Sequence, residues 1–449
     1  MMTAQPTRRA VLAGLSTLAA PISRVYAEGG IEWRQWTAEP RQIALRPDAT
    51  GKADLWVLGG SLPGPVLRLR HGEELRVRVD NKTTAPLSLH WHGIRGPNAM
   101  DGAAGLTEAP ALPGKSIEYR FVPPESGTYL IRSCVPGHSS ELTERGVAGL
   151  LIVEDQAPLD VDSDHVFLID DWLLEEDGSL APFDRPVGLA GRLGNWMTVN
   201  GHPAPHQIQV APASRIRLRL INGCNARILR LQFEGVRPLV MAIDGHPTDA
   251  FEPLRLALPF VPGSRYDLLI DLPAVEGSSA SVIGLSGMAR VPLAMFDVVG
   301  SAAPARPVPA PLAPHRDLPA SIRLEAAMRR DVTITSMDHP GASPEWRINE
   351  SPRDPTAKPL LTVKRGTPVV LTLANRTPAA QSLHLHGHAF RLLHSLDDGW
   401  EPYFLDTVQI PENRTVRIAF EANNPGRWML ASTILERFDA GLWTWLEVT

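Results

Sequence analysis

The sequence predicts an all-β protein made of several β-sandwich domains, and three observations support this class. Apolar and polar residues alternate over short stretches, turn-forming residues separate those stretches, and one stretch with its turn recurs far along the chain. The 42 prolines and 36 glycines follow no collagen-like period, which fits many short strands joined by turns. Helical periodicity is scarce throughout.

Length and composition exclude several classes of protein. A chain of 449 residues allows two to four domains, and 43% hydrophobic with 21% charged residues is typical of a soluble globular protein. The 44 Lys+Arg against 49 Asp+Glu give a net charge of −5 without a long basic run, so nucleic acid is not expected as a partner. Two cysteines, Cys134 and Cys224, cannot build a disulfide framework, although they leave room for one bridge.

The N-terminal residues resemble a twin-arginine export signal. Arg8-Arg9 precedes an uncharged stretch over residues 10–21, and Val25-Tyr26-Ala27 forms a small-residue cleavage site. The uncharged stretch is too short to span a hydrocarbon core of ~30 Å. We therefore expect residues 1–27 to be removed near Ala27 and the mature chain, which has no transmembrane segment, to reach the periplasm through the twin-arginine machinery.

Three stretches alternate, or nearly alternate, with the period of a half-buried strand, and each runs into a turn that contains asparagine. They are residues 75–79 before Asn81, residues 215–220 before Asn222, and residues 370–373 before Asn375. Their spacing is roughly one domain, so we expect one such strand and turn in each of three domains.

An internal repeat defines the predicted domain organisation. Residues 81–93 match residues 375–387 at a constant offset of 294, and residues 127–134 match residues 426–433 at nearly the same offset. The first and last thirds are therefore predicted to be copies of one β-domain. We place the domains at residues 28–156, 157–301 and 318–449, with a Pro/Ala-rich linker at 302–317.

Both copies of the repeat carry a His-x-His pair. Alternate residues of a strand share a face, so His90 with His92, and His384 with His386, can each direct two imidazoles into one cavity. Four converging imidazoles suit copper or zinc, whereas a lone His-x-His pair is more often a surface or hydrogen-bonded pair. His246, like the other middle-domain histidines, has no motif and is expected to be a surface or hydrogen-bonded residue.

These motifs resemble the three-domain multicopper oxidases, the laccase-like family, over essentially the whole mature chain. The matching stretches are Leu89-His90-Trp91-His92-Gly93, Met100-Asp101-Gly102, Arg145-Gly146-Val147-Ala148-Gly149-Leu150, Leu383-His384-Leu385-His386-Gly387-His388 and Pro425-Gly426-Arg427-Trp428. The resemblance implies three tandem cupredoxin-like Greek-key β-sandwich domains. It also implies a trinuclear copper cluster between the first and third domains, and a type-1 copper for electron entry in the third.

The chain departs from the family's pattern at most copper ligands. The usual type-1 ligands are replaced by Gln381, Ser432, Arg437 and Leu442, and four of the eight trinuclear ligands are replaced by Arg132, Cys134, Ala431 and Thr433. A blue copper centre requires a thiolate, which serine cannot supply. Of the ligand positions that the family resemblance implies, four still carry histidine, and we expect these as residual metal ligands: His90, His92, His384 and His386.

Four further residues bear on the chemistry of this region. The guanidinium of Arg132 would repel a cation, whereas the thiol of Cys134 would be a ligand for copper or zinc. Asp101 and Glu436 match family acids that deliver protons, so they are candidate relics of a proton relay and conceivable partners of Arg132.

Three functions are consistent with this pattern. The first is a non-catalytic family member, in effect a pseudoenzyme, that binds an unidentified periplasmic partner or ligand or serves as a scaffold. The second is a protein that holds one copper or zinc ion at His90 and His384, without the full complement of four coppers. The third is a copper-dependent oxidoreductase with unorthodox ligands, whose laccase-type activity would need a new route for electrons.

Overall fold

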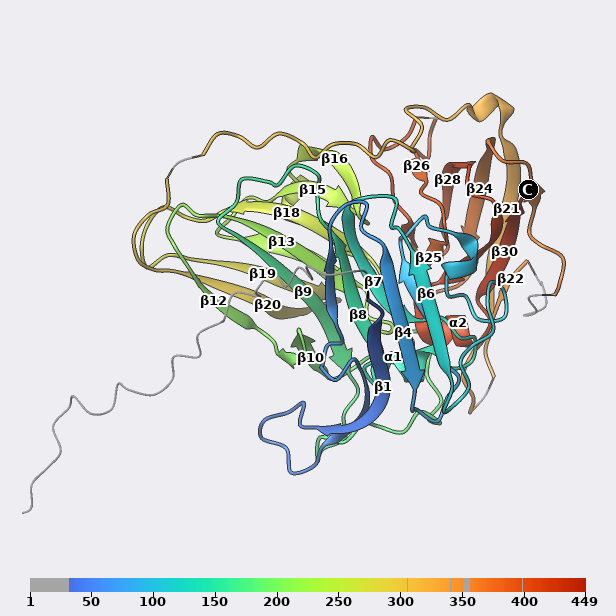
Figure 1. The fold of residues 1–449 in the computed structure, drawn as a ribbon, viewed down its shortest axis with the longest axis horizontal. Helices are drawn as coiled ribbons and strands as arrows, with labels where there is room; N and C mark the ends of the chain where they lie inside the picture. The colour runs from blue at the N-terminus through green and yellow to red at the C-terminus, as the bar shows by residue number, and fades with distance from the viewer. Residues whose placement is uncertain (1–31, 305, 340, 350–355, 398) are drawn as a thin grey trace, which may run out of the picture. The chain divides into compact units, whose positions relative to one another are not determined.

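The computed structural model describes residues 32–304, 306–339, 341–349, 356–397 and 399–449, and its regular structure is almost entirely β (Figure 1). The export signal predicted for residues 1–27 lies outside the described residues. The strands form six sheets that come in pairs along the chain, as the prediction of tandem β-sandwiches requires. No helix within the described ranges has the length and hydrophobicity needed to cross a bilayer.

The first pair of sheets has the strand orders β2-β1-β4-β6 and β3-β8-β7-β5. The strands are β1 (Arg34–Ile43), β2 (Ala53–Leu58), β3 (Val66–Leu69), β4 (Leu75–Asn81), β5 (Leu89–His92), β6 (Ser116–Phe121), β7 (Gly127–Ser133) and β8 (Ala148–Val153). Their inward faces enclose one core, in which Trp91 meets Tyr119 edge to face with ring centroids 5.5 Å apart. A 3₁₀ turn, η1 (Asn98–Met100), and helix α1 (Ser139–Glu144) interrupt the strands.

The second pair has the orders β11-β10-β9-β13-β18-β15-β16 and β12-β20-β19-β14-β17. Its strands are β9 (Ser163–Trp172), β10 (Trp196–Val199), β11 (His202–Pro203), β12 (His206–Val210), β13 (Arg215–Asn222), β14 (Leu229–Glu234), β15 (Leu239–Ile243), β16 (His246–Phe251), β17 (Ala257–Phe260), β18 (Arg265–Asp271), β19 (Ser279–Ser286) and β20 (Ala289–Val298), with the 3₁₀ turn η2 (Leu254–Leu256). The core between these two sheets includes the buried rings of Phe260 and Phe296.

The third pair has the orders β22-β21-β24-β28-β26 and β23-β30-β29-β25-β27. Its strands are β21 (Met328–Met337), β22 (Glu345–Ile348), β23 (Thr362–Val363), β24 (Thr367–Asn375), β25 (Gln381–Leu385), β26 (Arg391–Leu393), β27 (Thr407–Ile410), β28 (Thr415–Ala422), β29 (Gly426–Ser432) and β30 (Trp443–Val448), with η3 (Leu324–Ala326) and helix α2 (Leu435–Asp439). Neighbours that are distant in sequence, such as β21 with β24, mark the Greek-key crossovers.

The predicted strand-and-turn element is present in all three sandwiches. Asn81 donates from Nδ2 to the Ala85 carbonyl at 2.8 Å, and Asn375 donates to the Ala379 carbonyl at the same distance. Asn222 uses its side chain in a related way, since its Oδ1 accepts from the Cys224 amide at 3.0 Å. The asparagine therefore satisfies the backbone of the turn that follows each strand, which explains why it recurs.

The prediction of a half-buried strand at residues 215–220 is wrong, because all of β13 is buried. Its polar face carries Arg217 and Arg219, and the first sandwich covers this face. Arg219 donates to Thr128 Oγ1 of β7 at 2.8 Å and to Asp164 Oδ1 of β9 at 2.9 Å, and Arg217 pairs with Asp267. Alternation along β13 thus separates a hydrophobic core from a buried ionic interface, not from solvent.

A carboxylate from the third sandwich also binds the first. Asp439, the last residue of α2, accepts hydrogen bonds from the backbone amides of Gly137, Ser139 and Ser140 at 3.0, 3.0 and 2.8 Å. These amides lie at the start of α1, where they have no partner within the helix. The two short helices therefore join the sandwiches that carry the His-x-His pairs.

The buried ion pairs of β13 give a first prediction. Arg219→Ala should lower the free energy of unfolding by about 3 kcal/mol, because Asp164 and Asp267 lose a fully buried counter-charge and keep one arginine each, Arg68 and Arg217. Urea denaturation followed by tryptophan fluorescence measures this change. Arg290→Ala is the matched control, because its ion pair with Glu234 is about half exposed and should contribute little. If the two substitutions had equal effects, the buried ion pairs of β13 would not stabilise the interface between the first and middle sandwiches.

Candidate functional site

The structure brings the two His-x-His pairs together between the first and third sandwiches. His90 and His92 lie on β5, His384 lies on β25, and His386 follows that strand directly. The His90 and His386 rings stack with centroids 3.8 Å apart, and the His92 and His384 rings stack at 3.7 Å. All four side chains are buried. The two pairs therefore meet, and three of the four imidazoles, those of His90, His384 and His386, line one cavity.

Backbone carbonyls fix the tautomers of two of these histidines. His90 Nδ1 lies 2.7 Å from the Asp101 carbonyl, and His384 Nδ1 lies 2.9 Å from the Asp406 carbonyl. A carbonyl oxygen only accepts, so both Nδ1 atoms carry the proton and both Nε2 atoms keep a free lone pair. The two Nε2 atoms face each other at 3.3 Å. Gly102 permits this arrangement, because a Cβ on it would lie 2.0 Å from the Leu89 carbonyl of β5.

The other two histidines, His386 and His92, differ in which ring nitrogen carries the proton. His386 Nδ1 donates to Asp101 Oδ2 at 2.9 Å, which leaves its Nε2 free. Arg132 can only donate, so His92 Nδ1 accepts from it at 3.3 Å and His92 Nε2 donates to Thr407 Oγ1 at 3.0 Å. Three of the four imidazoles, those of His90, His384 and His386, therefore offer a nitrogen to a metal ion, and their ligand atoms lie within 4.8 Å of one another.

Burial keeps the imidazoles of His384 and His386 neutral at neutral pH. It lowers the pKa of His384 to about 4 and that of His386 to about 3, because the protonated ring would lose its hydration. Metal ligation requires the neutral ring, so the lone pairs are available. The space beside them has a volume of about 20 Å³ and is also lined by Arg132, Cys134 and Ala431. That is room for roughly one water-sized occupant.

Arg132 lies directly opposite His90 in the pairing of β5 with β7. Its side chain is buried; besides His92, it contacts the Thr433 carbonyl at 3.4 Å. Burial lowers its pKa to about 10, so it stays charged at neutral pH. The expectation that Asp101 or Glu436 would bind Arg132 is wrong, because each of these carboxylates has other partners.

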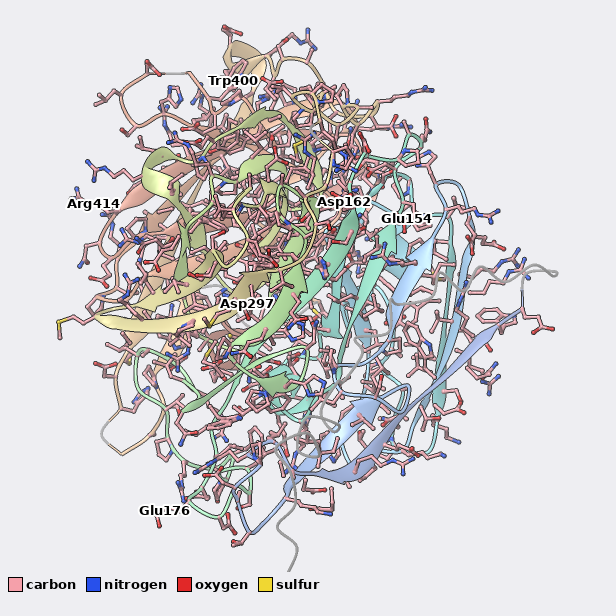
Figure 2. All side chains as sticks on the ribbon, turned by 90° about the vertical axis from the view of Figure 1, so that its left-hand side faces the viewer. Glu154, Asp162, Glu176, Asp297, Trp400 and Arg414 are labelled. Carbon is pink, nitrogen blue, oxygen red and sulfur yellow. The ribbon has the colours of Figure 1, made fainter. Side chains whose placement is uncertain are left out.

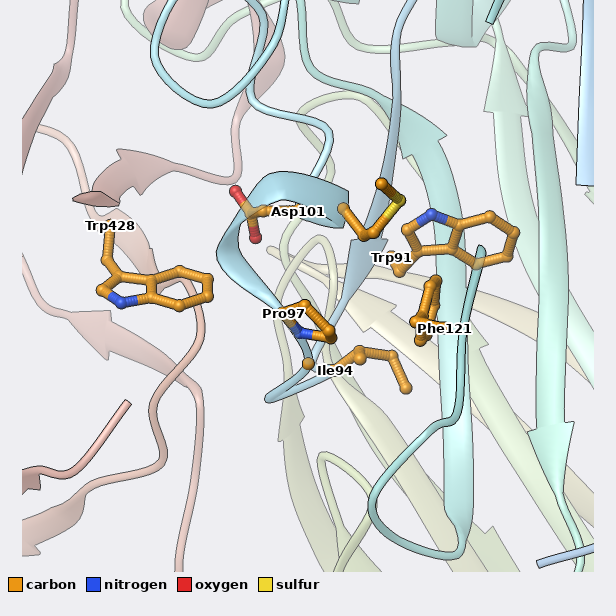
Figure 3. Close-up of a pocket in the computed structure, with 8 residues that line it drawn as sticks. Trp91, Ile94, Pro97, Asp101, Phe121 and Trp428 are labelled. Atoms are coloured by element: carbon orange, nitrogen blue, oxygen red, sulfur yellow. The ribbon is translucent and has the colours of Figure 1, made fainter. Parts of the chain in front are cut away.

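Asp101 lies at the end of η1, between Trp428 and the ring of Trp91 (Figure 3). Its carboxylate binds His386, and its backbone carbonyl binds His90. Burial alone would raise the pKa of Asp101, but the imidazoles of His386 and His90 hold it below its usual range. Asp101 is therefore an anion that orients two of the imidazoles.

Glu436 lies further away, in α2. Its Oε1 accepts from Ser140 Oγ at 2.7 Å and from Asn225 Nδ2 at 3.3 Å. Burial raises its pKa. No described side chain binds its other oxygen, Oε2, which is also buried. The structure thus places the two predicted acids in different surroundings, one beside the imidazoles and one between α1 and the middle sandwich.

Cys134 forms part of the cavity wall but is not among the described groups whose ligand atoms converge within 4.8 Å. It packs against Ala431, Met429 and Phe438. Burial raises the pKa of its thiol, so the protonated form is favoured. These surroundings are those of a small apolar residue.

A second region of interest surrounds Gln381, where the family resemblance implies a type-1 copper. Arg437 donates from Nη1 to Gln381 Oε1 at 2.7 Å and to the Ala380 carbonyl at 2.6 Å, and from Nη2 to the Leu189 carbonyl at 2.7 Å. Its guanidinium stacks over Trp346 at 4.6 Å. Ser432 is hydrogen-bonded to the Ile434 backbone, and Leu442 belongs to the hydrophobic core. An internally bonded amide and guanidinium thus occupy this position.

Several residues of the site were not predicted from the sequence. Asp406 and Thr407 contact His384 and His92, and the middle sandwich contributes Arg265, whose Nη2 lies 2.5 Å from Asp406 Oδ2. Burial alone would raise the pKa of Asp406, but Arg265 and His384 hold it below its usual range. The repeat contained a signal for Asp406: it follows His384 by 22 residues as Asp101 follows His90 by 11, and both carbonyls bind Nδ1. The longer segment between His384 and Asp406 hides the equivalence of Asp406 and Asp101 in the sequence.

The bonding of Arg437 gives a second prediction. Arg437→Met should lower the free energy of unfolding by about 3 kcal/mol, because one buried and two partly buried oxygens lose their donor. Thermal and urea denaturation check this value. Arg414→Met, which changes an exposed arginine of the same sandwich (Figure 2), should have little effect. A small loss at Arg437 would mean that water replaces its hydrogen bonds.

Comparisons with known proteins agree with this architecture. A family model described as multicopper oxidase matches residues 41–158, and a second with the same description matches residues 323–449. Multicopper oxidase MmcO of Mycobacterium tuberculosis is 27% identical over 427 residues, a match that covers 83% of this chain and 79% of that protein. Laccase-1 of Cryptococcus neoformans var. neoformans is 30% identical over 266 residues, which cover 53% of this chain and 42% of the laccase.

A solved structure shows the same fold over nearly the whole chain. The multi-copper oxidase from Pseudomonas thermotolerans superposes with a TM-score of 0.81 at 28% sequence identity, covering 93% of this chain and 99% of that one. The family models together match more than half of the chain, at its first and third sandwiches. From these matches and the shared three-sandwich fold, we conclude that this chain belongs to the multicopper oxidase family.

Proposed function

We propose that this protein is a copper-binding member of its family that holds one ion at His90, His384 and His386 and does not carry out the four-copper oxidase reaction. The observation that carries the proposal is the convergence of three unprotonated Nε2 atoms on a space of about 20 Å³. Two free lone pairs that face each other at 3.3 Å repel unless a cation lies between them. Imidazole is a preferred ligand of copper and of zinc.

The charges around the site favour copper in its monovalent state. Asp101 and Asp406 carry two negative charges, and Arg132 and Arg265 carry two positive charges, so the described surroundings are close to neutral without a metal. An added dication costs more Coulomb energy beside Arg132 than an added monocation does. Bound Cu⁺ would supply a redox-active centre, while Asp101 and the Asp406 carbonyl keep the imidazoles in the tautomers that ligation needs.

Two features support the loss of laccase-type activity. The hydrogen-bonded pair of Gln381 and Arg437 fills the region in which the family resemblance implies the electron-entry copper. Arg132 uses the lone pair of His92 on the other side of the cavity and leaves no nitrogen there for a further ion. Without an entry site, electrons from a phenolic substrate would have no defined path to the three histidines.

We further propose that the protein is exported through the twin-arginine pathway and functions in the periplasm. The proposal rests on Arg8-Arg9, the short uncharged stretch that follows and the small residue Ala27. This pathway carries folded proteins, so the sandwiches and their buried site would form before export. The alternative is a scaffold without metal. In that case Arg132 would provide a permanent positive charge beside the three histidines.

Metal content is the third prediction and the direct test of this function. The chain incubated with Cu⁺ under reducing conditions should retain one copper after gel filtration, with no intense blue band once oxidised and no oxidation of phenols. His90→Ala with His384→Ala should abolish the bound copper, because a single imidazole nitrogen remains. His388→Gln is the matched control, because its imidazole contacts the His386 carbonyl and is not among the three ligands.

The possible results separate the three functions. Elemental analysis that finds no copper in the unaltered chain would leave the scaffold function, and zinc in its place would contradict the charge argument but not the site. Several coppers with a blue band and phenol oxidation would contradict the proposal outright.

Arg132 gives a fourth prediction. Arg132→Met should raise the affinity for Cu⁺ by at least about tenfold, or ~1.4 kcal/mol, because a buried positive charge beside the ion is removed. Arg132→Lys keeps the charge and should leave the affinity close to that of the unaltered chain. Competition with a Cu⁺ chelator measures all three affinities. Equal affinities for Met and Lys would show that the charge of Arg132 does not act on the site.

A further inference from the structure

A second group of buried ligand atoms lies away from the four histidines of the first site. It consists of Glu125, in the loop before β7, His246, the first residue of β16, and His315, in the connection between the middle and third sandwiches. The side chains of Glu125 and His315 are each 6% exposed, and His246 is 2% exposed. Of the two alternatives expected for His246, a surface position is wrong because the residue is buried, and a hydrogen-bonded one is confirmed by its contact with His315.

Hydrogen bonding determines the tautomer of His315. Its Nε2 lies 3.0 Å from the Ser126 carbonyl, which only accepts, so Nε2 carries the proton. In the neutral ring, Nδ1 therefore holds a lone pair, and it faces the other two members of the group. That lone pair lies 3.2 Å from Glu125 Oε2 and 3.3 Å from His246 Nδ1. Atoms this close to one another need a proton or a metal ion between them.

Two of the three distances between the ligand atoms are close to those of a tetrahedral metal site, and all three atoms lie within 4.8 Å of one another. Zinc binds histidine nitrogen at about 2.0–2.1 Å and carboxylate oxygen at about 2.0–2.2 Å, so two ligand atoms on one tetrahedral ion are separated by about 3.3–3.5 Å. The observed 3.3 and 3.2 Å lie at or just below this range. A proton on His315 Nδ1 would be directed at either Glu125 Oε2 or His246 Nδ1, whereas a metal ion binds all three atoms at once.

Arg95 fixes the carboxylate in place. Its Nε donates to Glu125 Oε2 at 3.0 Å, and its Nη2 binds Oε1. Oε2 therefore accepts one hydrogen bond from Arg95 and keeps another lone pair toward the imidazoles. Carboxylates that bind metals are commonly oriented by such a hydrogen bond from a neighbouring residue.

The group also has an open side. Glu125 and His315 line a groove of about 730 Å³ together with Pro124, Ser126, Asp155 and residues 307–317. Three protein ligands with an accessible fourth position are the arrangement found where zinc keeps a water or exchanges a ligand. Arg306 anchors the same connection by binding Asp162 (labelled in Figure 2) at 2.6 Å.

We propose that Glu125, His246 and His315 form a second metal site, for Zn²⁺, that fastens the connection at residues 302–317 to the first and middle sandwiches. The site uses one ligand from each of these three segments. It shares no residue with the site of His90, His384 and His386, so each proposal can fail without the other.

The experiment measures zinc in a chain from which the first site has been removed. The full chain with His90→Ala and His384→Ala, stripped by a chelator and titrated with Zn²⁺, should retain one zinc after gel filtration. Adding His315→Gln or His246→Gln should abolish it. His202→Gln, at an exposed histidine of the middle sandwich, is the matched control and should leave one zinc in place.

A second measurement reports on the connection itself. Zn²⁺ should slow tryptic cleavage after the exposed Arg316 by about fivefold or more, because the connection must detach before it is cut. This protection should be absent in His315→Gln. Circular dichroism confirms that each variant folds; if His246→Gln does not, His315→Gln still decides, because His315 lies outside regular structure.

Two results would overturn the proposal. One is the absence of stoichiometric zinc in the chain that lacks only the first site. The other is unchanged zinc, or unchanged protection of Arg316, in His315→Gln.

Discussion

The contacts of one buried arginine link all three sandwiches, and the candidate copper site depends on them. Arg265 of β18 donates to the Thr128 carbonyl of the first sandwich at 3.1 Å, to the Asp244 carbonyl of its own at 2.7 Å, and to Asp406 of the third at 2.5 Å. Gly93 leaves room for it, since a Cβ there would lie 2.2 Å from the guanidinium. Through Asp406, this arginine holds His384 in the tautomer that presents Nε2 to the cavity.

Hydrogen bonding by two buried arginines accounts for how the fold persists with so many changes at the positions that the family resemblance assigns to copper. A metal bound only to the native state stabilises it, and its loss leaves polar groups without a partner. Here Arg132 and Arg437 supply permanent positive charge, and each is hydrogen-bonded to neighbouring side-chain or backbone atoms. Family membership therefore establishes the scaffold, whereas the chemistry depends on the residues that now fill it.

The two candidate metal sites lie in different places, but the same kind of hydrogen bond orients a histidine in each. In each, a backbone carbonyl accepts a hydrogen bond from one ring N–H of a histidine, so that the other ring nitrogen faces further ligand atoms. The first site lies between the sandwiches that carry the internal repeat. The second lies where the connection of residues 302–317 passes the first and middle sandwiches, so a metal there would act on the organisation of the chain.

The sequence by itself determined the all-β class, the three strand-and-turn elements and the meeting of His90, His92, His384 and His386, because these follow from periodicity and from a repeat at fixed offset. It also placed Arg132 and Arg437 at positions where the family resemblance implies histidine ligands. It did not reveal that β13 is buried on both faces, because alternation looks the same whether the polar face meets water or another domain. Nor did it reveal Asp406, Arg265 or the group of Glu125, His246 and His315, whose members are distant in sequence and carry no motif. Tertiary packing alone decided which nitrogen of each histidine is free, since the partner of the other nitrogen comes from a different segment of the chain.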